Sequence, residues 1–121
     1  MITQQQLTDK CTPEIIKKMV ELAEGFEYIE CEYNYYSIAV AGEQYGKIIE
    51  DDIIFPLLVH RSVEGWNKLN ATDNDFIFIG DNYIHYSKDS GNKFYELKDY
   101  QPTTLTHAEC AMLDCLLEVL K

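Results

Sequence analysis

Apolar and polar residues alternate at helical spacing over residues 12–24. At about 100° per residue the apolar side chains of this segment share one arc of a helix, while charged side chains occupy the other. The apolar set is Ile15, Ile16, Met19, Val20, Leu22 and Ala23. Thr12 fits an N-cap, Pro13 fits the first helical position and Gly25 fits the residue after the last turn. We therefore predict a helix over 12–24 with one face on a core and the other in solvent.

The same spacing recurs over residues 56–69 and 106–120. Pro56 suits the start of the first of these helices, whose polar arc holds His60, Arg61, Glu64, Asn67 and Lys68. Thr106 and Glu109, three residues apart, form a capping box at the start of the second. Apolar side chains cover most of the circumference of 106–120, so this helix is either the central core helix or half of an oligomer contact.

Aromatic and β-branched residues alternate with turn-forming residues between these helices, which is typical of strands. The predicted strands are 26–33, 35–41, 44–49, 76–79, 83–87 and 93–97. Hairpin turns are expected at residues 80–82 and 89–92, which combine Gly with Asp, Asn or Ser. The order α-βββ-α-βββ-α predicts an α+β fold with mainly antiparallel strands. We expect one domain over 1–121, in which 1–10 could form a flexible N-terminal segment.

Acidic residues outnumber basic ones by 21 to 10, which gives a formal net charge of −11. That charge repels a phosphate backbone and an anionic membrane, so direct nucleic-acid binding and membrane attachment are not expected. The surplus gathers around Glu21, Glu24, Glu27, Glu30, Glu32, Glu43, Glu50, Asp51 and Asp52. Such a field either keeps the chain soluble or imitates a nucleic acid and occupies a DNA-binding protein.

The chain has four cysteines: Cys11, Cys31, Cys110 and Cys115. Without an export signal or an apolar run of about 20 residues, we expect a cytoplasmic chain with reduced cysteines in its core. Cys110 and Cys115 are ~140° apart on the predicted helix and cannot share a tetrahedral metal ion. His107, Cys110 and Asp114 lie close in sequence, but one helix cannot form both sides of a catalytic cleft. We therefore expect no metal, no cofactor and no catalytic residue.

Tyrosines cluster in the first set of predicted strands. Successive side chains of a strand point to opposite faces, so consecutive tyrosines either meet solvent or rim the core of the protein. Exposed tyrosine is favoured in protein interfaces because it offers a large contact area at low entropic cost. The polar arc of the helix over 56–69 provides a second exposed surface. The candidate partner-binding residues are Tyr33, Tyr35, Tyr36, His60, Arg61 and Glu64.

Three stretches of the chain carry a resemblance to other proteins: Cys11–Phe26, Phe55–Asn67, and Tyr100–Pro102 with Leu105–Ala111. Together they resemble a group of small proteins encoded by phages and prophages of gut bacteria. The resemblance covers most of the chain, with the middle strands least matched. The group has no established activity, so it implies no catalytic residues. It implies an accessory phage protein, a class in which small inhibitors, adaptors and assembly factors are common.

The sequence thus favours a non-enzymatic protein-interaction module in the cytoplasm of a bacterial host cell. Its partner would be a host or phage protein, and a homo-oligomer is also compatible with the pattern. The alternative is an acidic nucleic-acid mimic that inhibits a host DNA-binding protein. A small Cys/His-dependent enzyme ranks third.

Overall fold

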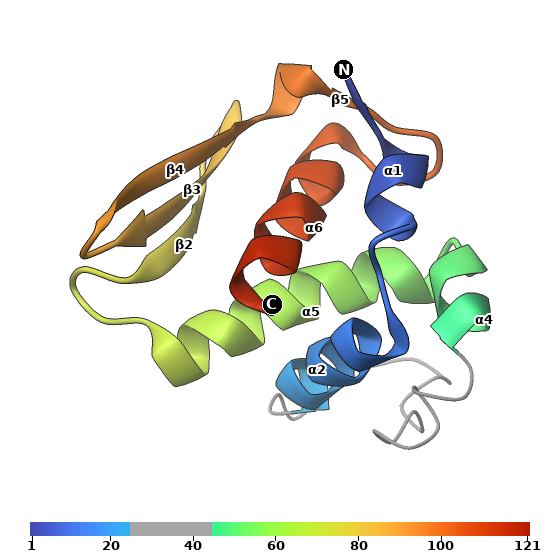
Figure 1. Cartoon of the computed structure of the whole chain (residues 1–121), viewed down its shortest axis with the longest axis horizontal. Coiled ribbons are helices and arrows are strands. Elements are labelled where there is room, and N and C mark those ends of the chain that lie inside the picture. The colour runs from blue at the N-terminus through green and yellow to red at the C-terminus, as the bar shows by residue number, and fades with distance from the viewer. Residues whose placement is uncertain (25–44) are drawn as a thin grey trace.

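The computed structural model describes residues 1–24 and 45–121, where helices and strands are mixed (Figure 1). The helices are α1 (Gln4–Thr8), α2 (Pro13–Glu24), α4 (Tyr45–Glu50), α5 (Ile54–Asn70), α6 (His107–Val119) and the 3-10 helix η1 (Leu97–Asp99). The strands are β1 (Ile2–Thr3), β2 (Phe76–Ile79), β3 (Tyr83–Lys88), β4 (Gly91–Glu96) and β5 (Tyr100–Gln101). The predicted α+β class is confirmed. The predicted order with three helices is not, because α1 and α4 add to it.

Helix α6 is the centre of the core. It lies between the three-stranded sheet and α1, with α5 crossing it (Figure 1). Seven of its residues are buried: Cys110, Ala111, Met112, Leu113, Cys115, Leu116 and Leu117. The predicted capping box is present, since Glu109 N–H donates to Thr106 Oγ1 (3.1 Å) and Thr106 N–H donates to Glu109 Oε1 (2.9 Å). Of the two interpretations of this apolar helix, the structure supports the central core helix.

Helices α2 and α5 pack against each other along their apolar faces. The fully buried Ser62 hydroxyl donates to the carbonyl of Met19 (3.1 Å), which joins the two helices where their backbones approach. Thr12 Oγ1 accepts from the N–H of Ile15 (3.3 Å), as expected of an N-cap. Both predicted helices are confirmed to within two residues at each end. Leu69, near the end of the predicted helix 56–69, is apolar but 67% exposed at the end of α5.

Strands β2, β3 and β4 form an antiparallel sheet in sequence order. The first predicted hairpin is confirmed, with Gly80 N–H donating to the Tyr83 carbonyl (2.9 Å). The second is tighter than predicted, because Lys88 pairs with Gly91 and only two residues turn the chain. Gly91 has φ = +140°, a backbone conformation that residues other than glycine rarely adopt. The predicted strands 76–79, 83–87 and 93–97 therefore correspond to β2, β3 and β4 with shifts of up to two residues.

The first ten residues are anchored rather than left outside the fold. Ile2 and Thr3 form β1, which pairs in parallel with β5 near the other end of the chain. Thr3 caps α1, and Leu7 of that helix is fully buried. The buried Gln4 side chain accepts three backbone N–H groups, those of Thr103, Thr104 and Leu105. This arrangement differs from the flexible segment that the sequence allowed.

Residues 44–49 were predicted as a strand, and this was wrong, because Tyr45–Glu50 form helix α4. The adjacent Ile48 and Ile49 favoured a strand by propensity. Instead, the segment packs on α5, and Ile48 is buried there. Asp51 Oδ1 then accepts the N–H groups of Ile53 and Ile54 and so leads the chain into α5. The predicted strands 26–33 and 35–41 lie outside the described residues.

Candidate functional site

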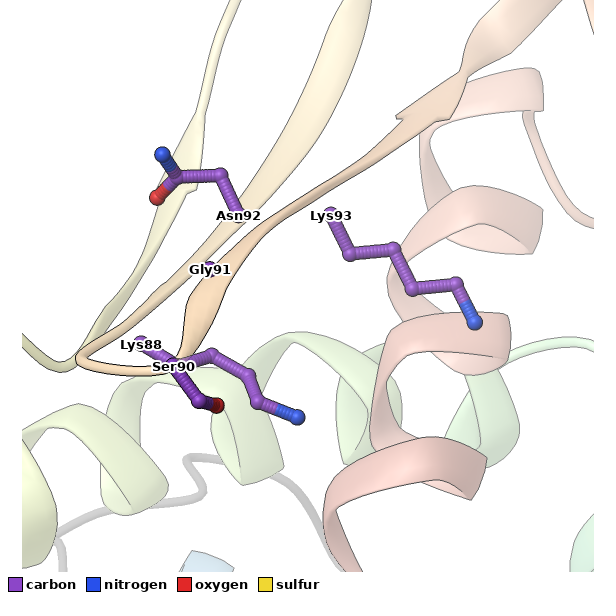
Figure 2. A pocket seen from close by; sticks show the side chains of 5 residues that line it. All are labelled: Lys88, Ser90, Gly91, Asn92 and Lys93. Carbon is purple, nitrogen blue, oxygen red and sulfur yellow. The ribbon is translucent and has the colours of Figure 1, made fainter.

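The outward face of the three-stranded sheet is built from alternate residues of its strands. Side chains of successive strand residues point to opposite faces, so the register assigns each residue to one face. Ile77, Ile84 and Tyr95 are buried on the inner face, which packs on α6. Figure 2 shows the alternation at the start of β4, where Asn92 and Lys93 point to opposite sides of the hairpin. The outward residues of the sheet are Phe76, Phe78, Tyr83, His85, Ser87, Asn92, Phe94 and Glu96.

Five of these outward residues carry rings that touch one another, and we call them the aromatic face: Phe76, Phe78, Tyr83, His85 and Phe94. His85 stacks on Phe94 with ring centres 4.3 Å apart and an interplanar angle of 9°. Tyr83 meets Phe94 at 5.5 Å and Phe78 at 6.3 Å, and Phe76 meets His85 at 5.8 Å. Asn92 Oδ1 lies 3.1 Å from His85 Nε2 and fixes that ring. The rings are therefore held in place before any partner arrives.

The aromatic face is open to solvent. Phe78 is 48% exposed and Phe94 is 52% exposed, although both rings are as large as those in the core. Four other large hydrophobic residues are exposed in the described part of the chain, and none belongs to this group of rings. Ile53 and Leu69 lie at the cap and the end of α5, Ile79 lies on the inner side of β2, and Met1 is the first residue. Single exposed apolar residues are ordinary on protein surfaces, whereas a contiguous group marks a binding surface. The aromatic face is such a group.

Charge is nearly absent from this outward surface. Glu96 is the one Asp, Glu, Lys or Arg side chain among its eight residues. The two lysines of the hairpin lie on the inner face, where Lys88 Nζ stands 5.1 Å from the ring centre of Tyr86 and Lys93 Nζ stands 5.1 Å from that of Tyr95. Lys93 also pairs with Glu118 of α6 at 3.6 Å. A ligand on this outward surface would thus meet rings, the Ser87 hydroxyl, the Asn92 amide and the Glu96 carboxylate.

The predicted contact residues of α5 take part in contacts within the chain. His60 Nε2 lies 2.8 Å from Glu109 Oε2, which joins α5 to the start of α6. Arg61 pairs with Glu64 at 3.0 Å along α5 itself. The side chains of His60 and Glu64 are about half exposed, so they remain accessible. The predicted contact residues Tyr33, Tyr35 and Tyr36 lie outside the described residues.

Two shallow hollows adjoin the β3–β4 turn. One, of about 390 Å³, is lined by Trp66, Asn70, Asp75, Tyr86, Lys88, Asp89 and Ser90. The other, of about 260 Å³, is lined by Lys88, Ser90, Gly91, Asn92 and Lys93 (Figure 2). Neither contains a cysteine or a histidine, so neither pairs a nucleophilic thiol with an imidazole base. Asp75 Oδ1 accepts the N–H of Asp89 (3.1 Å), which engages this carboxylate in holding the turn.

The cysteines with described positions are buried thiols. Burial raises the pKa of Cys110 to about 11 and the pKa of Cys11 and Cys115 to about 12. Each thiol is therefore protonated at neutral pH, whereas a nucleophilic or metal-binding cysteine needs the thiolate. Asp114, which we considered with Cys110 and His107, accepts a hydrogen bond from Tyr100 Oη (2.7 Å). This geometry gives no support to a Cys/His-dependent enzyme.

Within residues 1–24 and 45–121, no group of three or more His, Cys, Asp or Glu side chains is placed to hold a metal ion. None of the helices in this part of the chain has both the length and the apolar character that crossing a membrane requires.

Sequence reasoning missed the aromatic face although it predicted all three strands. Phe76, Ile77, Phe78 and Ile79 are apolar at every position, so the usual alternation that separates a wet face from a dry one is absent. The available signal was the pairing of Phe78, His85 and Phe94 across the sheet, which appears only once the register is known. No protein-family model matches this chain, and neither the curated proteins nor the solved structures contain a match to it.

Proposed function

We propose that the chain is a non-enzymatic protein-interaction module that binds another protein through the aromatic face. The observation that carries this proposal is the exposure of Phe78 and Phe94 within a cluster of ring contacts. Aromatic residues are enriched where protein interfaces gain most of their binding energy. Rings that already hold one another lose little conformational freedom on binding, so more of the contact energy is retained as affinity.

The charge of the surface favours a protein partner over a nucleic acid. Proteins that stack bases on aromatic rings also need a positively charged groove that follows the phosphate backbone. Here the outward surface has one charged residue, Glu96, and the hairpin lysines lie on the opposite face. The formal charge of −11 adds a repulsion that every phosphate would meet. A partner with apolar and basic side chains suits this surface better.

The size of the face constrains the interaction. Three strands about 4.8 Å apart, with up to about six residues of 3.3 Å each, present ~250 Å² of flat surface. A standard interface buries about 800 Å² on each partner. The aromatic face is therefore the centre of a larger contact, to which neighbouring parts of the chain must contribute. The polar surface of α5 with His60, Arg61 and Glu64, and the tyrosines Tyr33, Tyr35 and Tyr36, which lie outside the described residues, remain separate proposed partner-binding sites.

Affinity capture from a bacterial lysate tests the proposal, with the full chain as bait. The test variant Phe78→Ser/Phe94→Ser removes the two exposed rings. Ile53→Ser/Leu69→Ser is the matched control, because those residues are 66% and 67% exposed but belong to α5 and its cap. We expect the ring variant to capture at least about tenfold less partner protein than the wild-type chain does. The control should stay within about twofold of wild type, since isolated exposed apolar residues contribute little.

Equal capture by both double variants would refute the aromatic face as the binding surface. Capture of a DNA-binding protein that survives the ring substitutions but disappears at high salt would favour the acidic mimic instead, because that interaction depends on the net charge.

A further inference from the structure

The two edges of the three-stranded sheet differ in how their backbone groups are satisfied. At the edge formed by β2, the side chain of Asn67 lies along the strand. The N–H of Ile77 donates to Asn67 Oδ1 (2.9 Å), and Asn67 Nδ2 donates to the carbonyl of Ile77 (2.8 Å). One side-chain amide thus makes the pair of bonds that a neighbouring strand would make. The β2 edge is closed at its centre.

Among the described residues, the edge formed by β4 has no neighbouring strand. Two hydrogen bonds at the ends of the hairpins set which backbone groups of each strand face the neighbouring strand. Gly80 N–H donates to the Tyr83 carbonyl, and Leu97 N–H donates to the Asn82 carbonyl. Alternation then directs the N–H and C=O groups of Lys93 and Tyr95 toward β3. The N–H and C=O groups of Asn92 and Phe94 and the N–H of Glu96 point away from the sheet, and no element of the described chain pairs with β4 on that side. The carbonyl of Glu96 instead accepts the first hydrogen bond of η1, whose N-cap is Glu96. Three donors and two acceptors, those of Asn92 and Phe94, are therefore arranged for one more strand.

We propose that an extended, basic segment of a partner protein adds to the sheet as a fourth strand beside β4. This inference rests on the proposed function and specifies the kind of partner and its mode of binding. Strand addition supplies what the aromatic face lacks in area, because main-chain hydrogen bonds give affinity while alternate side chains give specificity. An exposed edge strand is a template for such pairing.

The side chains along β4 define the chemistry of the added strand. On the side of the sheet that carries the aromatic face, residues of the added strand would lie beside Phe94 and Glu96. An apolar side chain beside Phe94 and a lysine or arginine beside Glu96 suit these positions. Side chains of opposite charge that lie across from each other on neighbouring strands stabilise the pairing of the two strands. The net charge of −11 draws a basic segment toward the chain. The same charge opposes a second copy of this chain as the added strand, since both molecules would carry it.

Glu96 offers a substitution that blocks the edge and spares the fold. Its φ of −73° is close to the angle that proline requires, and its N–H points out of the sheet. Glu96→Pro therefore removes one outward donor and places a ring at the edge, while the bonds between β3 and β4 remain. Glu96→Gln is the matched control, because it removes the same charge but keeps the N–H.

The probe is a display library of random peptides about twice the length of β4, selected against the immobilised full chain. We expect the selected peptides to alternate apolar residues and to carry lysine or arginine. Their affinity should fall at least about tenfold on Glu96→Pro, because a peptide carbonyl loses its donor and meets the proline ring. It should change no more than about threefold on Glu96→Gln, as expected for a single exposed charge pair.

Amide hydrogen exchange on the wild-type chain gives a second measurement that needs no variant. Saturation with a selected peptide should slow the exchange of the outward N–H groups of Asn92, Phe94 and Glu96 at least about tenfold, because each becomes hydrogen-bonded. Unchanged exchange at all three overturns strand addition even where the Glu96→Pro chain fails to fold.

The remaining outcomes separate this inference from the proposed function. Peptides that bind Glu96→Pro as well as wild type but lose affinity for Phe78→Ser/Phe94→Ser overturn strand addition and leave the aromatic face as a binding surface. A library that yields no binder also overturns strand addition, while capture of a folded partner by the aromatic face is judged by its own assay. Sedimentation gives one more outcome. If the wild-type chain is dimeric and the Glu96→Pro variant is monomeric, the proposal of a basic partner segment is overturned and the β4 edge pairs with a second copy of the chain.

Discussion

Gln4 ties the start of the chain to the segment before α6, and replacing it with alanine should destabilise the whole fold. Its Oε1 accepts the N–H groups of Thr103 (2.9 Å), Thr104 (3.0 Å) and Leu105 (2.9 Å). Its Nε2 donates to Thr104 Oγ1 (2.8 Å). The Gln4 side chain is 7% exposed, so water cannot simply take its place. Gln4→Ala removes all four bonds at once.

The cost follows from the burial of the groups left behind. The Leu105 N–H is buried, and a buried donor without an acceptor costs about 1–3 kcal/mol. The other two N–H groups are only partly buried, so water can reach them, and each loses about 0.5 kcal/mol. Loss of the bond to Thr104 Oγ1 adds a similar amount. We expect a total of about 3 kcal/mol, a large share of the ~5–15 kcal/mol that stabilises a typical domain.

Urea unfolding followed by the fluorescence of Trp66, the single tryptophan, measures this change. With a slope near 2 kcal/mol per molar, the midpoint should fall by about 1.5 M. Gln5→Ala is the matched control, because Gln5 is exposed and its side chain bonds only to Asp9 of the same turn region (2.7 Å). If Gln4→Ala and Gln5→Ala unfold within about 0.5 kcal/mol of each other, the anchoring role of Gln4 is refuted.

Two further changes test other parts of the structure. Asn67→Ala should lower the free energy of unfolding by about 2 kcal/mol, because it removes both bonds to Ile77. It should also make light scattering rise with protein concentration, because it opens the apolar β2 edge. The control Asn70→Ala, whose side-chain bond is exposed, should show neither effect. An Asn67→Ala chain as stable and as monomeric as Asn70→Ala would contradict this. Stability should also fall as the pH rises from about 9 toward 12, because burial raises the pKa of Cys11 from 9.0 to about 12 and only the unfolded chain gains the thiolate in that window. Melting temperatures should show this loss, and a fall just as steep in Cys11→Ala would rule out the Cys11 thiol as its source.

Local signals in the sequence were sufficient for the elements that carry their own caps and turns. Thr106 with Glu109 gave the start of α6, and Gly80 with its neighbours gave the first hairpin, because these contacts lie within a few residues of one another. The start of α1 had the same kind of signal in Thr3 and Gln6, which form a second capping box. That signal was missed because a helix of five residues has almost no periodicity to accompany it.

Long-range pairing accounts for most of what the sequence could not provide. The anchoring of residues 1–10 depends on contacts about a hundred residues away, such as those of Gln4 with Thr103 and Thr104. The segment that became α4 was misassigned because its isoleucines favour a strand, whereas its neighbour in space is a helix. The aromatic face required the register of three strands. Side-chain pairing across a sheet is a property of tertiary structure rather than of local composition.

The central place of α6 has a consequence for how the chain is synthesised. Helices α1 and α5, strands β3, β4 and β5, and η1 all pack against α6, yet residues 107–119 are translated after every one of them. Until these residues leave the ribosome, the apolar sides of α5 and the sheet have nothing to cover them. Nascent chains in that state are prone to aggregation and are typical substrates of chaperones. The protein therefore completes its core only after translation of α6, and ribosomes stalled before residue 107 should hold an unfolded, chaperone-bound chain.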